Sequence, residues 1–161
     1  MATKTSKRTG ESSTTVSVGI RIDPKIKFAL DIMGRLQKRS LTAVIEWSIS
    51  QAIDQQSTDH NGTSLSTVLD MVWSTDESTR LVMLAIHLPQ ALTYDELRVW
   101  ETIKVSSYFW VKYPDLSFDN NPDRLDIAAV RAGWSDLMAH VELYRASSTI
   151  TPIDEKNIIP F

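Results

Sequence analysis

The sequence predicts a mainly α-helical protein with one short strand near its N-terminus. Residues 16–22 alternate strictly between apolar and polar side chains, which is typical of a half-buried strand, and no other segment alternates as well. After position 24 the apolar residues recur at spacings of three and four, as they do on one face of a helix. We therefore expect one strand and two helices over residues 15–54, followed by an all-helical domain over residues 64–148.

The composition favours a folded protein with no membrane partner. The length of 161 residues suits one ordinary domain or two small ones, and a hydrophobic content of 42% is enough for a packed core. The sequence includes no cysteine. No run of 18 apolar residues is present, and the first fifteen residues lack the apolar segment of a secretory signal. These observations predict a cytoplasmic protein.

The net charge of −3 conceals a strong asymmetry along the chain. Residues 1–40 contain nine Lys or Arg and three Asp or Glu, whereas residues 41–161 contain eight and seventeen. A basic N-terminal block on an acidic body predicts that the first part meets a polyanion. The polar composition of the remaining segments predicts a disordered basic arm at 1–14, a linker at 55–63 and a tail at 149–161.

Helix-start signals follow the strand directly. Asp23 is a good N-cap and Pro24 suits the first helical position, so a first helix is expected from there. Ser40 is the expected N-cap of a second helix. The two apolar stripes of these helices comprise Ile26, Leu30, Met33 and Leu36, and then Val44, Ile45, Ile49, Ala52 and Ile53.

A unit of about 40 residues cannot bury enough apolar area alone. A single strand also leaves its backbone hydrogen-bonding groups unpaired. We therefore expect an intertwined homodimer in which two copies of the strand pair antiparallel and four helices cover one face. In this arrangement the inward side chains are Val16, Val18, Ile20 and Ile22, and the outward positions are Ser17, Gly19 and Arg21.

The stretch "TVSVGIRIDPKIKFALDIMGRLQKRSLTAVIEWSISQAI", about a quarter of the chain, resembles the ribbon-helix-helix family of DNA-binding proteins. The resemblance implies that the ribbon enters the major groove, where outward strand side chains read base edges. Those positions are Ser17, Gly19 and Arg21. Arg21 is the best candidate because its guanidinium can donate two hydrogen bonds to guanine.

The resemblance also implies a phosphate contact at the N-terminus of the second helix, where free N–H groups and the helix dipole favour anions. Two positions depart from the family pattern. Gly19 carries no side chain to read a base, and Lys38 stands where the turn between the helices usually has glycine. The phosphate-binding candidates are Lys38, Arg39, Ser40, Leu41 and Thr42.

The C-terminal part predicts helices over 65–74, over 77–88, from the Thr93–Glu96 capping box to about 111, and from about 121 onward. Residues 81–88, "LVMLAIHL", are apolar all round, which indicates either a central core helix or a surface used in assembly. We expect assembly first, in which this domain joins dimers into tetramers. Its tryptophans predict a core, or alternatively a small-molecule pocket.

No pattern predicts an enzyme, a cofactor or a metal site. His60, His87 and His140 lack ligand spacing, and His87 is expected to be a core residue. There is no phosphate-binding glycine loop, nucleophile elbow or paired catalytic carboxylate motif.

The sequence therefore predicts a sequence-specific double-stranded DNA-binding protein associated with the nucleoid, most simply a transcriptional repressor. Two alternatives stay open. One is a plasmid partition or relaxosome accessory protein that acts by higher-order assembly, and the other is an antitoxin that regulates its own synthesis. The helical domain then binds another copy, a protein partner or a small effector.

Overall fold

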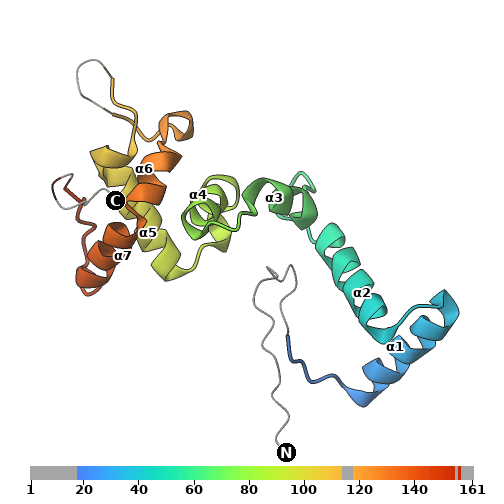
Figure 1. Cartoon of the computed structure of the whole chain (residues 1–161). Coiled ribbons are helices and arrows are strands. Elements are labelled where there is room, and N and C mark those ends of the chain that lie inside the picture. Colours follow the sequence, from blue (N-terminus) through green and yellow to red (C-terminus); the bar gives the residue numbers. More distant parts are fainter. Residues whose placement is uncertain (1–17, 114–117, 155, 157–161) are drawn as a thin grey trace, which may run out of the picture. The chain divides into compact units, whose positions relative to one another are not determined.

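The structure is a computed structural model that describes residues 18–113, 118–154 and 156, and these residues are mainly helical, as the sequence predicts (Figure 1). The chain divides into two compact units, residues 1–49 and 50–161. Each unit is described by itself below. Within the described ranges, no helix is both long and apolar enough to cross a membrane.

The first unit contains α1 (Pro24–Gln37) and most of α2 (Leu41–Gln55), which meet at a short turn (Figure 1). Both helices begin where the sequence predicts. Asp23 Oδ1 accepts a hydrogen bond from the Lys25 N–H at 2.8 Å, with Pro24 in the first helical position. Ser40 Oγ accepts from the Ala43 N–H at 3.2 Å, so Ser40 caps α2.

The turn between α1 and α2 depends on a left-handed residue and on a close backbone approach. Lys38 has φ 53° and ψ 42°, so a lysine takes the conformation for which glycine is usual. The Arg39 N–H then donates to the Gly34 carbonyl oxygen at 2.9 Å. Gly34 is buried, and a Cβ at this position would lie 3.0 Å from the Arg39 carbonyl oxygen.

The predicted ribbon strand is not formed by the residues that the structure describes. Val16 and Ser17 lie outside those residues, and residues 18–22 adopt no regular secondary structure. A strand needs a neighbouring backbone to pair with, and a single chain offers none here. The ribbon therefore stays a prediction that only a second copy of the chain can complete.

The second unit is a helical domain with its own core. It contains α3 (Leu65–Val72), α4 (Glu77–His87), α5 (Tyr94–Val105), α6 (Ile127–Ala132) and α7 (Trp134–Leu143), with 3-10 turns at Pro89–Ala91, Ser107–Phe109 and Pro122–Arg124. α4 contacts α3, α5 and α6 and is thus the central helix. The buried core comprises Leu81, Val82, Ala85, Val99, Trp100, Ile103, Phe109, Trp110, Val130, Leu137 and Ile153.

The central position of α4 explains its apolar sequence. Leu81, Val82 and Ala85 are buried in the core of the second unit, so the apolar run is accounted for without an assembly surface. The expectation that His87 is a core residue is wrong, because His87 lies on the exposed side at the end of α4.

In the second unit, the predicted capping box agrees with the structure, whereas several predicted helix ends do not. The capping box is confirmed: the Glu96 N–H donates to Thr93 Oγ1, and the Thr93 N–H donates to the Glu96 carboxylate. α5, however, ends at Val105 rather than near 111, and the last predicted helix is divided at Gly133 into α6 and α7. The residues that follow α5 include Phe109 and Trp110, which are buried in the core of the second unit.

Candidate nucleic-acid interface

The structure describes two of the three candidate base-reading positions. Gly19 and Arg21 are exposed, whereas Ser17 lies outside the described residues. A Cβ built on Gly19 would meet no atom within 4 Å, so none of the described residues occupies the space beside it. Arg21 makes no hydrogen bond or ion pair with any described residue. Its guanidinium is therefore available to an external acceptor.

The start of α2 presents backbone donors. Ser40 and Thr42 are exposed and Leu41 is half-buried. The Ser40 hydroxyl already accepts the Ala43 N–H, and Val44 N–H donates to the Ser40 carbonyl oxygen at 3.0 Å. The N–H groups of Leu41 and Thr42 have no acceptor inside the helix, because the first turn of a helix never provides one. Together with the positive end of the helix dipole, they suit an anion such as a phosphate.

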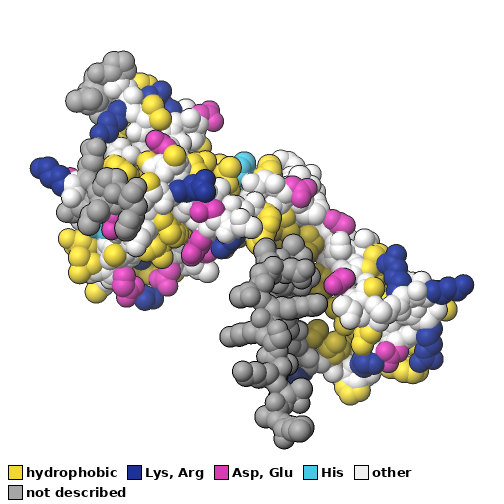
Figure 2. Space-filling view, viewed as in Figure 1, with side chains coloured by type: hydrophobic (Ala, Val, Ile, Leu, Met, Phe, Trp, Pro, Cys, Tyr) yellow, Lys and Arg dark blue, Asp and Glu magenta, His cyan; other side chains and the backbone are white. Residues whose placement is uncertain are grey.

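Basic side chains surround this helix start. Figure 2 shows Lys and Arg side chains gathered over α1 and the α1–α2 turn. Lys38 and Arg39 form no ion pair within the described residues. The nearby carboxylate of Asp31 is engaged by Lys27, whose Nζ lies 2.6 Å from it. The charge of the turn is therefore positive and accessible.

Besides its basic turn, the first unit has a large exposed apolar surface. Only Gly34 and Val44 are buried in the first unit's two helices. So little burial is unusual for a folded unit of this size, and an exposed apolar surface of this extent is typical of an interaction site. The large apolar side chains that remain 37% to 79% exposed are Val18, Ile20, Ile26, Phe28, Ile32, Leu36, Trp47 and Ile49.

Part of that surface was missed by the sequence pattern. The predicted stripe on α1 includes Ile26 and Leu36, which are exposed, and Leu30 and Met33, which are half-buried. Phe28 and Ile32 were not included, although they are 60% and 39% exposed. With Leu36 they recur at a spacing of four residues, so a second apolar stripe could have been found on the same helix.

No family model, curated protein or solved structure matches this chain. The resemblance to the ribbon-helix-helix family therefore stays a prediction that depends on the residues of the first unit.

In the described part of the chain, no group of three His, Asp or Glu side chains is placed to hold a metal ion. The Nε2 atom of His140 instead lies 2.9 Å from the Thr151 carbonyl oxygen.

Proposed function

We propose that this protein is a sequence-specific double-stranded DNA-binding protein that acts as a homodimer and represses transcription by occupying an operator. The observation that carries the proposal is the pairing of two features in the first unit. The first unit exposes a large apolar surface that a second copy of the chain would bury, and the basic, capped start of α2 lies in the same unit.

Dimerisation provides what the single unit lacks. When two copies of residues 16–22 pair antiparallel, their backbone groups are satisfied and Val18 and Ile20 become part of a shared core. These two side chains are 76% and 60% exposed in the single chain, so their burial contributes a substantial part of the stability of the dimer. The exposed side chains of α1 then cover the same face.

DNA recognition divides between two sets of groups. Arg21 and Ser17 face the major groove in this proposal and read base edges, while Gly19 lets the backbone approach closely. The α2 N-terminus, with Lys38 and Arg39, binds the phosphate backbone and fixes the register of the ribbon. Phosphate contacts contribute most of the affinity, so binding should weaken steeply as the salt concentration rises.

The second unit favours a regulator over an antitoxin. Antitoxin segments that neutralise a toxin are expected to be short and unfolded alone, whereas residues 50–161 form a unit with a core of their own. A plasmid accessory protein would use the same DNA contacts and differ by higher-order assembly. Because the apolar residues of α4 are used in the core, they no longer provide a reason to expect such assembly.

The decisive experiment is selection of bound sequences from a random duplex library by the full-length protein, with Arg21→Ala selected in parallel. We expect short half-sites in an inverted or tandem repeat, and a loss of preference at one base pair per half-site in the variant. If the protein binds duplexes at low salt but no sequence is enriched, sequence-specific recognition would be contradicted. Enrichment of long clustered repeats with filament-like cooperativity would favour the plasmid accessory protein instead.

A further inference from the structure

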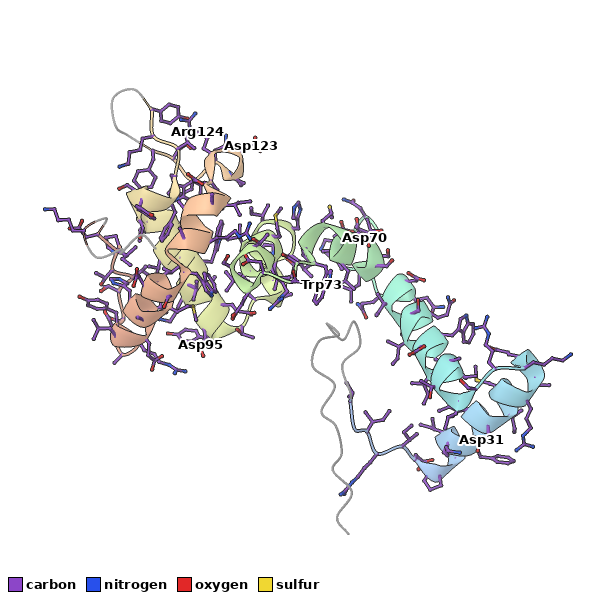
Figure 3. The ribbon with its side chains drawn as sticks, in the orientation of Figure 1. Asp31, Asp70, Trp73, Asp95, Asp123 and Arg124 are labelled. Carbon is purple, nitrogen blue, oxygen red and sulfur yellow. The ribbon has the colours of Figure 1, made fainter. Side chains whose placement is uncertain are left out.

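A cavity of about 280 Å³ lies in the second unit, between α4, α5 and α7. Its size is near the lower end of the range of small-molecule sites in proteins, so only a small ligand fits. Figure 3 shows Asp95, one of the lining residues, at the N-terminal end of α5. The apolar lining comprises Leu81, Leu84, Val99, Trp134, Met138 and Val141.

Two arginines that line the cavity form no ion pair with a carboxylate of the described residues. Arg98 is only 7% exposed, and its guanidinium donates to the carbonyl oxygens of Tyr144 at 2.9 Å and Ser147 at 3.1 Å. Its Nε atom is buried without any acceptor among the described residues. Arg80 donates to the Ser74 carbonyl oxygen at 2.8 Å and forms no ion pair in the same part of the chain. Neutral oxygens thus hold both cations in place without neutralising their charge.

The carboxylates around the cavity, by contrast, are mostly engaged. Arg145 lies 3.1 Å from Asp95 and 3.4 Å from Glu142, so it neutralises part of their charge. Glu96 accepts the Thr93 N–H in the capping box. Glu77 lies in the first turn of α4, where the helix dipole stabilises a negative charge. The lining therefore holds four carboxylates and three arginines, and the buried donor that lacks an acceptor among the described residues is the Arg98 Nε–H, which a bound acceptor would satisfy.

We infer that this cavity binds a small organic carboxylate with an aromatic or branched apolar body. The apolar lining takes the body of the ligand, and Arg80 and Arg98 attract the carboxylate, with which a guanidinium can form two parallel hydrogen bonds. A single negative charge suits the site better than a phosphate dianion, because the acidic side chains at its edge repel a second charge. The inference does not depend on DNA binding by the first unit.

The test is a titration of full-length protein with three probes of the same shape: 3-phenylpropionate, the neutral 3-phenylpropanol and the cationic 3-phenylpropylamine. Amide NMR shifts of residues in α4, α5 and α7 report binding. We expect saturable shifts with the carboxylate, at a Kd of about 1 mM or tighter, and at least about tenfold weaker binding of the other two.

Two arginine variants separate anion recognition from packing. Arg80→Gln should weaken binding of 3-phenylpropionate about tenfold or more, since it removes an unmatched cation. Arg131→Gln removes an arginine on α6 that does not line the cavity, and it should leave the affinity for 3-phenylpropionate unchanged. Val141→Phe should block all binding by filling the cavity, and thermal unfolding checks that each variant folds.

Several results would overturn the inference. Equal binding of the alcohol and the carboxylate, unaffected by Arg80→Gln, would show an apolar cavity without anion recognition. Tighter binding of the amine would show that Glu77 and the other carboxylates set the charge preference. An absence of shifts with all three probes would mean that the cavity does not take ligands of this class.

Discussion

Gly34 and Arg39 are joined across the α1–α2 turn by a 2.9 Å hydrogen bond from the Arg39 N–H to the Gly34 carbonyl oxygen. The same approach crowds a larger residue, because a Cβ at position 34 would lie 3.0 Å from the Arg39 carbonyl oxygen and the backbone would have to shift by a few tenths of an ångström. Since Arg39 and Ser40 lead directly into α2, this contact sets where the candidate phosphate site lies.

Gly34→Ala should therefore destabilise the protein although alanine favours helices. Alanine gains about 1 kcal/mol of helix propensity, whereas crowding against a backbone atom costs about 1–3 kcal/mol. We expect a net loss of about 1 kcal/mol in the free energy of unfolding, measured by urea denaturation of the full chain. Gly19→Ala is the matched control, because its Cβ would meet no atom within 4 Å. Equal stability of the two variants would show that the turn can open freely.

Ile20→Asp should abolish the homodimer. Ile20 is 60% exposed in the single chain, and in the proposed ribbon it enters the shared core, where an unpaired carboxylate is strongly disfavoured. We expect the dimer dissociation constant to rise about 100-fold or more, as measured by analytical ultracentrifugation. Gly19→Asp places the same charge on the next residue, which faces outward, and should leave the dimer intact. Dissociation by Gly19→Asp alone would reverse the assigned faces of the strand.

Arg21→Ala should lower the affinity for the selected operator by about 1–3 kcal/mol and relax preference at one base pair per half-site. Arg21 is exposed and forms no hydrogen bond or ion pair with described residues, so its removal should leave thermal stability unchanged. Fluorescence anisotropy with matched and single-substituted duplexes measures both effects. Arg39→Ala provides the comparison, since loss of a phosphate contact weakens all duplexes alike. A uniform loss with Arg21→Ala would assign Arg21 to the backbone instead.

Asp76 should make the stability of the second unit depend on pH in the acid range. Hydrogen bonds from the side chain of Ser78, and then from Thr79, lower the pKa of Asp76 from 3.8 to about 2, with a smaller effect of Arg131. Because the folded-state pKa is depressed, the stabilisation is present above pH 3.8 and is lost as the pH falls towards 2.

Asp76→Asn keeps an N-cap acceptor for α4 but removes the titrating charge. Thermal unfolding between pH 2 and 6 should show the variant less stable than the wild type at the upper end, with the difference shrinking as the pH falls below about 4. Asp70→Asn is the control, since Asp70 is exposed and forms no hydrogen bond or ion pair with the residues that the structure describes. A constant difference over the whole pH range would exclude Asp76 as the titrating group.

The sequence by itself determined the local features of both units. The starts of α1 and α2 at Asp23-Pro24 and Ser40, and the Thr93–Glu96 capping box, are readable because a cap involves residues within one helical turn. The left-handed position in the α1–α2 turn was also indicated, although it is held by Lys38 instead of glycine. Alternation assigned the outward positions of residues 16–22, and the resemblance to the ribbon-helix-helix family made them candidates for DNA binding.

Only the tertiary structure decided which apolar residues meet each other. The run at 81–88 fits a core and an assembly surface equally well as a pattern, and packing against α3, α5 and α6 assigned α4 to the core. The cavity depends on Arg98, whose partners Tyr144 and Ser147 lie more than forty residues away along the chain. Such contacts leave no local signature, because periodicity and capping report only on neighbours within a few residues. The proposed ribbon would be harder still to predict, since its backbone partner would belong to a second copy of the chain.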